Sequence, residues 1–181
     1  MKRRTRLRIK IWLILAVFII SSTVLWVSCK SQEEIPITIE IAEVKAEAPE
    51  TKQYILAIPL SEELQEQLYE ASKEFGVDYY IMVALIEKET KFCNVTGDGG
   101  RSYGYCQIQP RWWSGIMADI GAKDLLIPKD NFRTGCAIMA QLTARYKSVE
   151  GALVAYNQGH YRGYSTKYSR EIIANAGNYR K

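Results

Sequence analysis

The chain is predicted to be a mainly α-helical domain with a buried central helix, preceded by an N-terminal membrane segment. Three observations lead to this prediction. The chain of 181 residues opens with a basic stretch joined to an apolar run, and its segment 80–86 is apolar on nearly every side. Strand patterns are almost absent beyond residue 58. About 120 residues of helix suffice for an independent core.

The first 28 residues are interpreted as a basic N-terminus and a membrane anchor. Six Lys and Arg fall within the first ten positions, and the following run, 11–27, is interrupted only mildly at 21–23. Such a sequence is typical of a signal peptide or an uncleaved signal anchor, and its 17 residues reach the lower limit for spanning a bilayer. The basic flank stays in the cytoplasm, so we expect everything after Val27 to lie outside it. An uncleaved anchor is favoured; lipidation of Cys29 or secretion is the alternative.

The basic charge of the chain belongs to this N-terminus. Of 24 Lys and Arg residues, six lie in the first ten positions, which leaves 18 against 20 Asp and Glu. Nucleic-acid binding requires a concentrated basic face, and the rest of the chain offers none. No nucleic-acid partner is therefore expected.

The cysteine spacing matches no zinc signature, and the only histidine is His160. Neither a metal nor a cofactor is expected. Cys93 and Cys106 bracket a glycine-rich loop, so a disulfide between them would fix that loop in an oxidising exterior. Buried free thiols at these two positions and at Cys136 are the alternative.

An extended linker is expected over residues 29–58. Its alternating isoleucines, from Ile35 to Ile41, suit a strand, but a strand with no partner is not stable. The helical domain is expected to fill 59–181. Its first helix begins after a Ser61 N-cap and ends at Gly76, and Asp78 caps the apolar helix that follows.

Four more helices are expected beyond a glycine-rich loop at 97–100. Pro110 suits the first turn of a helix, and glycines follow two of the predicted ends. The predicted helices cover 110–120, 131–146, 150–156 and 165–176.

Glu89, at the end of the apolar helix, is the candidate catalytic residue. Partial desolvation of a carboxyl raises its pKa. A carboxylic acid with a raised pKa is able to protonate a leaving-group oxygen near neutral pH, which glycoside cleavage requires. Composition by itself favours a solvated glutamate instead. Glu87 faces elsewhere on the helix and serves as the natural comparison.

Four motifs that follow one another along the chain favour the catalytic interpretation of Glu89. They are Glu89-Thr90-Lys91-Phe92, then Gly104-Tyr105-Cys106-Gln107-Ile108-Gln109-Pro110, then Asn131-Phe132-Arg133-Thr134-Gly135, and finally Ala152-Leu153-Val154-Ala155-Tyr156-Asn157-Gln158-Gly159. Over roughly residues 59–164 this order resembles the soluble lytic transglycosylase (SLT) domain and, more distantly, goose-type lysozyme. The resemblance implies a lysozyme-like fold that acts on peptidoglycan glycan strands.

The resemblance also implies roles for individual residues. Glu89 matches the single catalytic acid/base, Gln107 a glutamine that lines the cleft, and Tyr156 a tyrosine near the acid. Amide side chains supply paired donors and acceptors for acetamido groups, a tyrosine hydroxyl orients the carboxyl, and a glycine allows close backbone approach to a sugar. The predicted substrate-binding residues are Ser102, Tyr103, Gly104, Gln107, Gln109, Tyr156 and Asn157.

Two groups of aromatic residues are interpreted differently. Trp112 and Trp113 follow Pro110, where core packing is the commoner fate of a tryptophan, although one of them is able to stack on a sugar. The C-terminal tyrosines are expected at the outer rim of the cleft; they are Tyr161, Tyr164, Tyr168 and Tyr179.

Asp98 decides between two mechanisms. It lies nine residues after Glu89, where transglycosylases often have a serine. With Glu89 as the only carboxylate, the 6-hydroxyl of the substrate attacks and a 1,6-anhydro sugar forms. With Asp98 across the cleft to activate water, the product is hydrolysed with inversion. Asp98 as an ordinary turn residue in Gly-Asp-Gly-Gly is equally compatible with the sequence.

The sequence thus predicts a membrane-anchored, extracytoplasmic enzyme that cleaves the MurNAc–GlcNAc bond of peptidoglycan. A lytic transglycosylase is favoured, and a hydrolytic muramidase is the alternative. A wall-binding adaptor of an envelope machine, with the fold kept and the activity lost, is the hypothesis from another class. The retained Glu89 counts against that adaptor.

Overall fold

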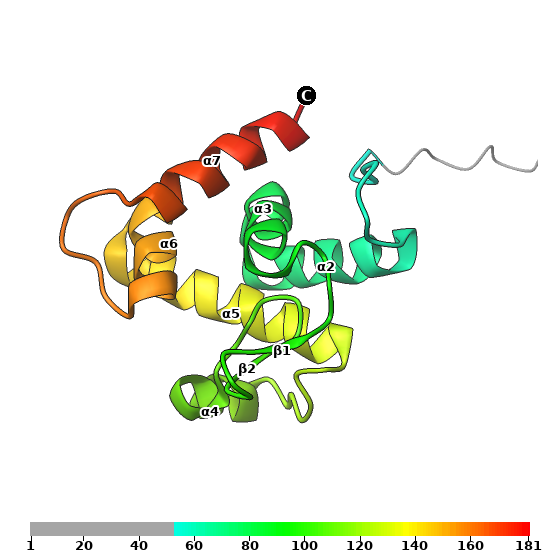
Figure 1. Ribbon diagram of the computed structural model, residues 1–181, viewed down its shortest axis with the longest axis horizontal. Coiled ribbons are helices and arrows are strands. Elements are labelled where there is room, and N and C mark those ends of the chain that lie inside the picture. Colours follow the sequence, from blue (N-terminus) through cyan, green and yellow to red (C-terminus); the bar gives the residue numbers. More distant parts are fainter. Residues whose placement is uncertain (1–52) are drawn as a thin grey trace, which may run out of the picture. The chain divides into compact units, whose positions relative to one another are not determined.

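Six helices and one short hairpin make up the regular structure of residues 53–181, the part of the chain that the computed structural model describes (Figure 1). The mainly α-helical prediction is confirmed for this part. The predicted membrane segment and most of the predicted linker lie outside it, and no helix within 53–181 is long and apolar enough to cross a bilayer. The elements are α2 (Glu62–Phe75), α3 (Tyr79–Thr90), β1 (Thr96–Gly97), β2 (Ser102–Tyr103), α4 (Pro110–Asp119), α5 (Pro128–Tyr146), α6 (Val149–Gln158) and α7 (Lys167–Tyr179).

Helix α3 is the buried central helix that the sequence predicts. Its residues from Met82 to Ile86 are fully inaccessible to solvent. Both α2 and α7 pack against it, while α5 packs against α2 and α6 (Figure 1). Because α3 is apolar all round, its polar groups gather at its two ends. The end that carries Glu89 is where the site forms.

The predicted helix caps are confirmed. The Ser61 side chain accepts from the Leu64 N–H, and the Asp78 side chain accepts from the N–H groups of Tyr80 and Ile81. Gly76 ends α2 in the left-handed conformation, with φ of 64°. These signals are local, so the sequence determines them without reference to the rest of the fold.

Three helices extend further than expected. Helix α5 starts at Pro128, which occupies its first turn, rather than at residue 131. Helix α6 runs from a Ser148 cap to Gln158 and ends at Gly159, with φ of 79°. Helix α7 passes through Gly177 and ends at Tyr179. Tertiary packing outweighs the roughly 1 kcal/mol by which a helical glycine is disfavoured.

The start of the domain lies within the stretch assigned to the linker. The Tyr54 ring stacks on the Tyr69 ring of α2, with centroids 3.9 Å apart. The buried Gln65 side chain accepts from the Leu56 N–H at 2.8 Å and donates to the Leu56 and Leu60 carbonyls. Residues from Tyr54 onward are therefore attached to α2.

The cysteines of the described residues are all free thiols, so the predicted Cys93–Cys106 disulfide is not formed. Cys93 lies on the surface, where its thiol donates to the Lys91 carbonyl, whereas Cys106 and Cys136 are buried. The Cys106 sulfur packs against Gly135, at which a Cβ would lie only 2.8 Å from that sulfur. Cys106 is thus a core residue rather than a partner of the exposed Cys93.

Asn131 holds the segment between the hairpin and α4. Its Oδ1 accepts from the Cys106 N–H at 2.8 Å, and its Nδ2 donates to the Tyr103 and Leu125 carbonyls, each at 2.9 Å. Gly104 lies against this amide with φ of 73°. A Cβ at Gly104 would lie 2.1 Å from the Asn131 Nδ2 and 2.3 Å from the Leu125 oxygen. Gly104 is therefore required by packing inside the protein.

We predict that Gly104→Ala lowers the free energy of unfolding by at least about 3 kcal/mol, because a left-handed backbone and a direct clash add together. Gly99→Ala is the matched control. Gly99 also has a positive φ, 61°, but a Cβ there meets nothing within 4 Å. Only the backbone cost of about 1–2 kcal/mol is expected for it. Urea unfolding of both variants measures the difference, and equal losses would contradict the packing argument.

Candidate active site

Glu89 lies in the last turn of α3, where its partly buried carboxyl meets α7. The Tyr168 hydroxyl of α7 donates a hydrogen bond to Glu89 Oε1. The Oγ1 of the next residue, Thr90, lies 3.1 Å from both the Ile86 and the Tyr105 carbonyl oxygens, which share its single O–H proton. The end of α3 is thereby attached both to α7 and to the segment before α4.

Burial raises the pKa of Glu89 above its ordinary value. The hydrogen bond from Tyr168 and the charge of Lys88 lower the pKa, but burial is the larger influence. The pKa of Tyr168 is itself raised, by burial first and by the Glu89 charge second, so Tyr168 remains a protonated donor. The carboxyl thus has one close donor, which is neutral, and retains its proton to a higher pH than a solvated glutamate.

Tyr156 lies near this carboxyl, as the resemblance implies, but its hydroxyl serves another purpose. It donates to the Cys106 carbonyl at 2.7 Å, which ties α6 to the segment before α4. Burial raises the Tyr156 pKa, and the nearby Cys106 and Glu89 add to the effect. The tyrosine that orients the carboxyl is Tyr168, which the sequence places at the outer rim of the cleft. That expectation was wrong.

Tyr156 also lines a groove of about 520 Å³, and Glu89 is not among the lining residues of this groove. Four of the predicted substrate-binding residues line it, and so do both tryptophans. Trp112 is 66% exposed and does not pack in the core, contrary to its expected fate, whereas Trp113 is half-buried. The lining residues are Gln107, Ile108, Gln109, Trp112, Trp113, Ala155, Tyr156, Asn157, Gln158 and Gly159.

The two glutamines of the groove do not offer paired donors and acceptors. Gln107 Nε2 donates to the Val95 carbonyl at 3.0 Å and to the Gly104 carbonyl at 2.9 Å. Gln109 Nε2 donates to Asp98 Oδ2 at 3.1 Å and to Ser102 Oγ at 3.2 Å. Each amide has only two N–H donors, so only an acceptor oxygen remains on each. The exposed Asn157 is the predicted residue whose amide keeps both functions.

The other three predicted substrate-binding residues do not line this groove. Ser102 is buried at 5% exposure and accepts from Gln109. The Tyr103 hydroxyl donates to the Gly100 carbonyl at 2.7 Å, across the hairpin turn. Gly104 packs against Asn131. These residues shape the β1–β2 hairpin, whose pairs are Thr96↔Tyr103 and Gly97↔Ser102.

Asp98 lies in the hairpin turn with φ of 51°, and each of its carboxylate oxygens accepts one side-chain hydrogen bond. Arg101 pairs with Oδ1 at 2.7 Å, and Gln109 donates to Oδ2. Within residues 53–181 no hydrogen bond or ion pair joins Asp98 to Glu89. An inverting hydrolase holds its two carboxyls about 6.5–9.5 Å apart, so the hydrolytic mechanism does not require a direct contact between Asp98 and Glu89.

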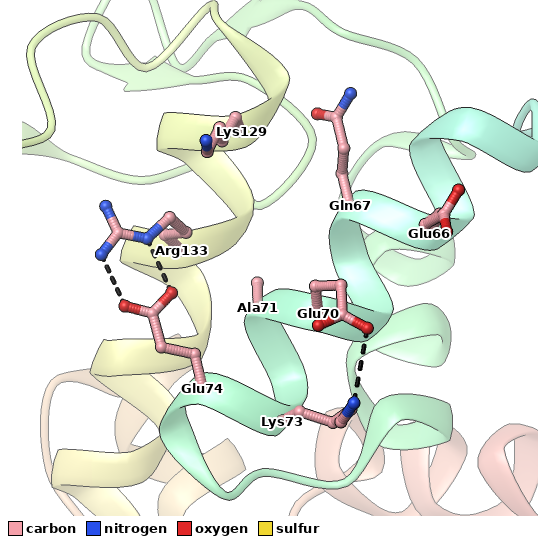
Figure 2. A pocket seen from close by; sticks show the side chains of 8 residues that line it. All are labelled: Glu66, Gln67, Glu70, Ala71, Lys73, Glu74, Lys129 and Arg133. Carbon is pink, nitrogen blue, oxygen red and sulfur yellow. Dashed lines mark hydrogen bonds and ion pairs between the residues drawn. The ribbon is translucent and has the colours of Figure 1, made fainter. Parts of the chain in front are cut away.

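A larger hollow, about 700 Å³, lies between α2 and α5 (Figure 2). It is bordered by ion pairs, with Glu74 and Arg133 2.5 Å apart and Glu70 and Lys73 3.5 Å apart. The Glu70–Lys73 pair is exposed and the Glu74–Arg133 pair is partly exposed, and none of the predicted site residues lines the hollow. The larger of these two hollows is therefore not the candidate active site. The described residues also contain no cluster of three or more His, Cys, Asp or Glu suited to a metal ion.

Comparisons with known proteins identify the family and the fold. Residues 66–172 match the family described as the transglycosylase SLT domain, which is more than half of the chain. Among solved structures, the chain is similar to the X-ray structure of an inactive mutant of the lytic transglycosylase Slt from Pseudomonas aeruginosa, with 18% sequence identity and a TM-score of 0.56. The similarity covers 67% of this chain and 24% of the Slt chain, so this chain spans about a quarter of the length of Slt. The lysozyme-like fold is confirmed.

We predict that Tyr168→Phe raises the pKa of Glu89 further. The hydroxyl stabilises the charged carboxylate, and its removal leaves burial unopposed by that hydrogen bond. Carbon-detected NMR titration of the Glu89 carboxyl measures the shift. Tyr164→Phe, which alters an exposed tyrosine, is the control and leaves the Glu89 titration in place. A Glu89 pKa that falls or stays constant in Tyr168→Phe would contradict the assigned contact.

Proposed function

The chain belongs to the transglycosylase SLT domain family, and we propose that it is a lytic transglycosylase that cleaves the MurNAc–GlcNAc bond of peptidoglycan. Glu89 is the single catalytic acid/base in this proposal. The observation that carries it is a partly buried carboxyl with a raised pKa and a tyrosine donor. Besides burial, the charge of this carboxyl also raises the pKa of Tyr156, which lines an open groove of aromatic and amide side chains. Such a combination suits an acid that acts on a polar ligand in a cleft.

The proposed reaction takes place in two proton transfers. Protonated Glu89 donates to the glycosidic oxygen as the bond from C1 breaks. The resulting carboxylate then accepts the proton of the 6-hydroxyl of the same muramic acid residue, whose oxygen attacks C1 and closes the 1,6-anhydro ring. No water is consumed. Burial favours the protonated start, and the Tyr168 hydrogen bond stabilises the charged carboxylate between the two transfers.

The contacts of Asp98 within the protein account for this residue without a role in hydrolysis. A base that activates water needs an acceptor oxygen directed at that water, opposite the acid. Asp98 instead accepts from Arg101 and Gln109 within the protein. In the muramidase alternative the attacking water would use the lone pairs of Asp98 that these two contacts leave open.

We further propose that the enzyme acts outside the cytoplasm, attached to the membrane by its N-terminus. The basic start and the apolar run at 11–27 support this location. The proposed substrate agrees with it, because peptidoglycan lies on the outer side of the cytoplasmic membrane.

Glu89→Gln is expected to reduce peptidoglycan cleavage by at least about 100-fold, because it removes the proton that the leaving oxygen needs. Glutamine keeps the size of the side chain and an acceptor for Tyr168, so the fold is retained. The matched control is Glu62→Gln, on the exposed first turn of α2. Release of soluble fragments from purified peptidoglycan is the measurement. Cleavage by Glu89→Gln at the wild-type rate would refute the catalytic assignment, and an inactive wild-type protein would favour the adaptor.

Trp112→Ala is expected to raise the KM for soluble glycan fragments by about two- to tenfold, through loss of an aromatic surface in the groove. Its exposure means that folding stability changes little. Tyr164→Ala, also exposed but outside the groove lining, is the control. Trp112→Phe should recover part of the loss. An unchanged KM in Trp112→Ala would exclude a contact between this ring and the glycan.

A further inference from the structure

We propose that Asp98 is a positioning residue, which fixes Gln109 as an acceptor-only contact for an N–H or O–H group of the bound amino sugar. This inference rests on the proposed function only in taking the groove to be the glycan-binding surface. It gives Asp98 a role in specificity, distinct from water activation and from simple turn formation.

The Gln109 side chain is directed at the hairpin rather than at its own helix. Gln109 occupies the N-cap position of α4 with an extended backbone, φ −99° and ψ 106°, yet makes no side-chain capping hydrogen bond. Its amide nitrogen donates instead to Asp98 and Ser102. The side chain is thereby held at the edge of the groove that it lines.

The partners determine which way the amide faces. An ionised carboxylate only accepts hydrogen bonds, so the NH₂ group of Gln109 must face Asp98. The second N–H is taken by Ser102 Oγ. Oε1 is then the free end of the amide, and it has no hydrogen-bond partner within residues 53–181. Gln109 therefore presents an acceptor, and no donor, to the groove.

Asp98 is contacted twice by Arg101, on the exposed side of the hairpin turn. Arg101 donates through one guanidinium nitrogen to Asp98 Oδ1 at 2.7 Å and through Nε to the Asp98 carbonyl at 2.9 Å. Arg101 thus binds both the backbone and the carboxylate of Asp98 across the hairpin turn. The orientation of Gln109 thus follows from the hairpin, which sets Asp98, Arg101 and Ser102 together.

Gln107 also donates both hydrogens of its amide nitrogen within the protein, but its amide oxygen is placed differently. Its Oε1 lies over Gly97, where a Cβ would be only 2.1 Å away. That oxygen is covered by the hairpin backbone. Of the two glutamines, Gln109 is the one whose acceptor remains open to a ligand.

The consequence is chemical selectivity at one point of the groove. A hydroxyl or an acetamido N–H placed there forms a hydrogen bond with Oε1. An ether oxygen, carbonyl or carboxylate placed there leaves two acceptors facing each other, which is disfavoured. Without Asp98 the amide is free to rotate, and this discrimination is lost.

The test compares Asp98→Ala, Asp98→Asn, Gln109→Ala and the Asp98→Ala/Gln109→Ala double variant on soluble glycan fragments. We expect Asp98→Ala and Gln109→Ala each to raise KM by about two- to tenfold and to change kcat by less than about threefold. Asp98→Asn keeps an acceptor oxygen for Gln109 and should recover most of the KM. The double variant should be no worse than either single variant, because both remove the same contact. Asp119→Ala, on the exposed end of α4, is the control.

Two outcomes would overturn the inference. An unchanged KM in Asp98→Ala would mean that Gln109 needs no positioning. A loss of kcat of about 100-fold or more in both Asp98→Ala and Asp98→Asn would make Asp98 the water-activating base, while glycan cleavage by this protein would stand. Gln109→Ala leaves the Asp98–Arg101 pair in place, so it tests the contact even if Asp98→Ala unfolds.

A binding measurement separates the inference from the proposed function. The Glu89→Gln protein is titrated with oligomers of β-1,4-linked N-acetylglucosamine, with and without the changes at Asp98 and Gln109. The Kd is expected to be higher with Asp98→Ala than with Asp98→Asn, as for the KM. If this order is found and the wild-type protein does not cleave peptidoglycan, the inference is upheld and the proposed function is refuted. If the Kd values are equal and the wild-type protein cleaves peptidoglycan, the inference is refuted and the proposed function is upheld.

Discussion

The burial of one carboxyl, that of Glu89, is the constraint on which the site depends. Removing a carboxylate from water is unfavourable unless it is paired, and the structure gives it a neutral tyrosine rather than a buried cation. Its pKa stays raised as a result. The same contact makes α7 part of the site. Lys88 pairs with Glu171 at 2.5 Å and Asn175 donates to Glu87 at 3.0 Å, so three points fix α7 along α3.

The second requirement is a rigid connection between this carboxyl and the groove. The segment before α4 provides it, held by Asn131 from α5, by Thr90 from α3 and by the Tyr156 hydroxyl from α6. Each contact reaches a backbone group of residues 103–106, so the segment has little freedom. The close approach of Asn131 is possible only because residue 104 is a glycine. Several residues of the motif thus serve the geometry of the site rather than the ligand.

The sequence predicts well what local chemistry determines. The Ser61 and Asp78 caps, the glycine end of α2 and the proline start of α4 are set by neighbours in the chain, and all are found. The central apolar helix follows from composition. Glu89 as the candidate acid came from the order of the motifs, because a carboxyl at a helix end carries no such information by itself.

Contacts between distant parts of the chain could not be predicted in the same way. Tyr168 reaches Glu89 across 79 positions, and nothing in its neighbourhood distinguishes it from the other C-terminal tyrosines. The role of Asp98 depends on a hairpin register that places it beside Gln109. The exposure of Trp112 depends on how α4 packs, which one proline and two tryptophans do not reveal.

The central claim is that Glu89 cleaves the glycan without a second carboxylate and without water. Digestion of purified peptidoglycan in heavy-oxygen water, followed by mass analysis of the released fragments, tests it most directly. The account predicts 1,6-anhydro ends, one water lighter than the hydrolysed product, with no heavy oxygen incorporated. Reducing ends that carry one heavy oxygen per cleavage would contradict it and would make the protein a hydrolase.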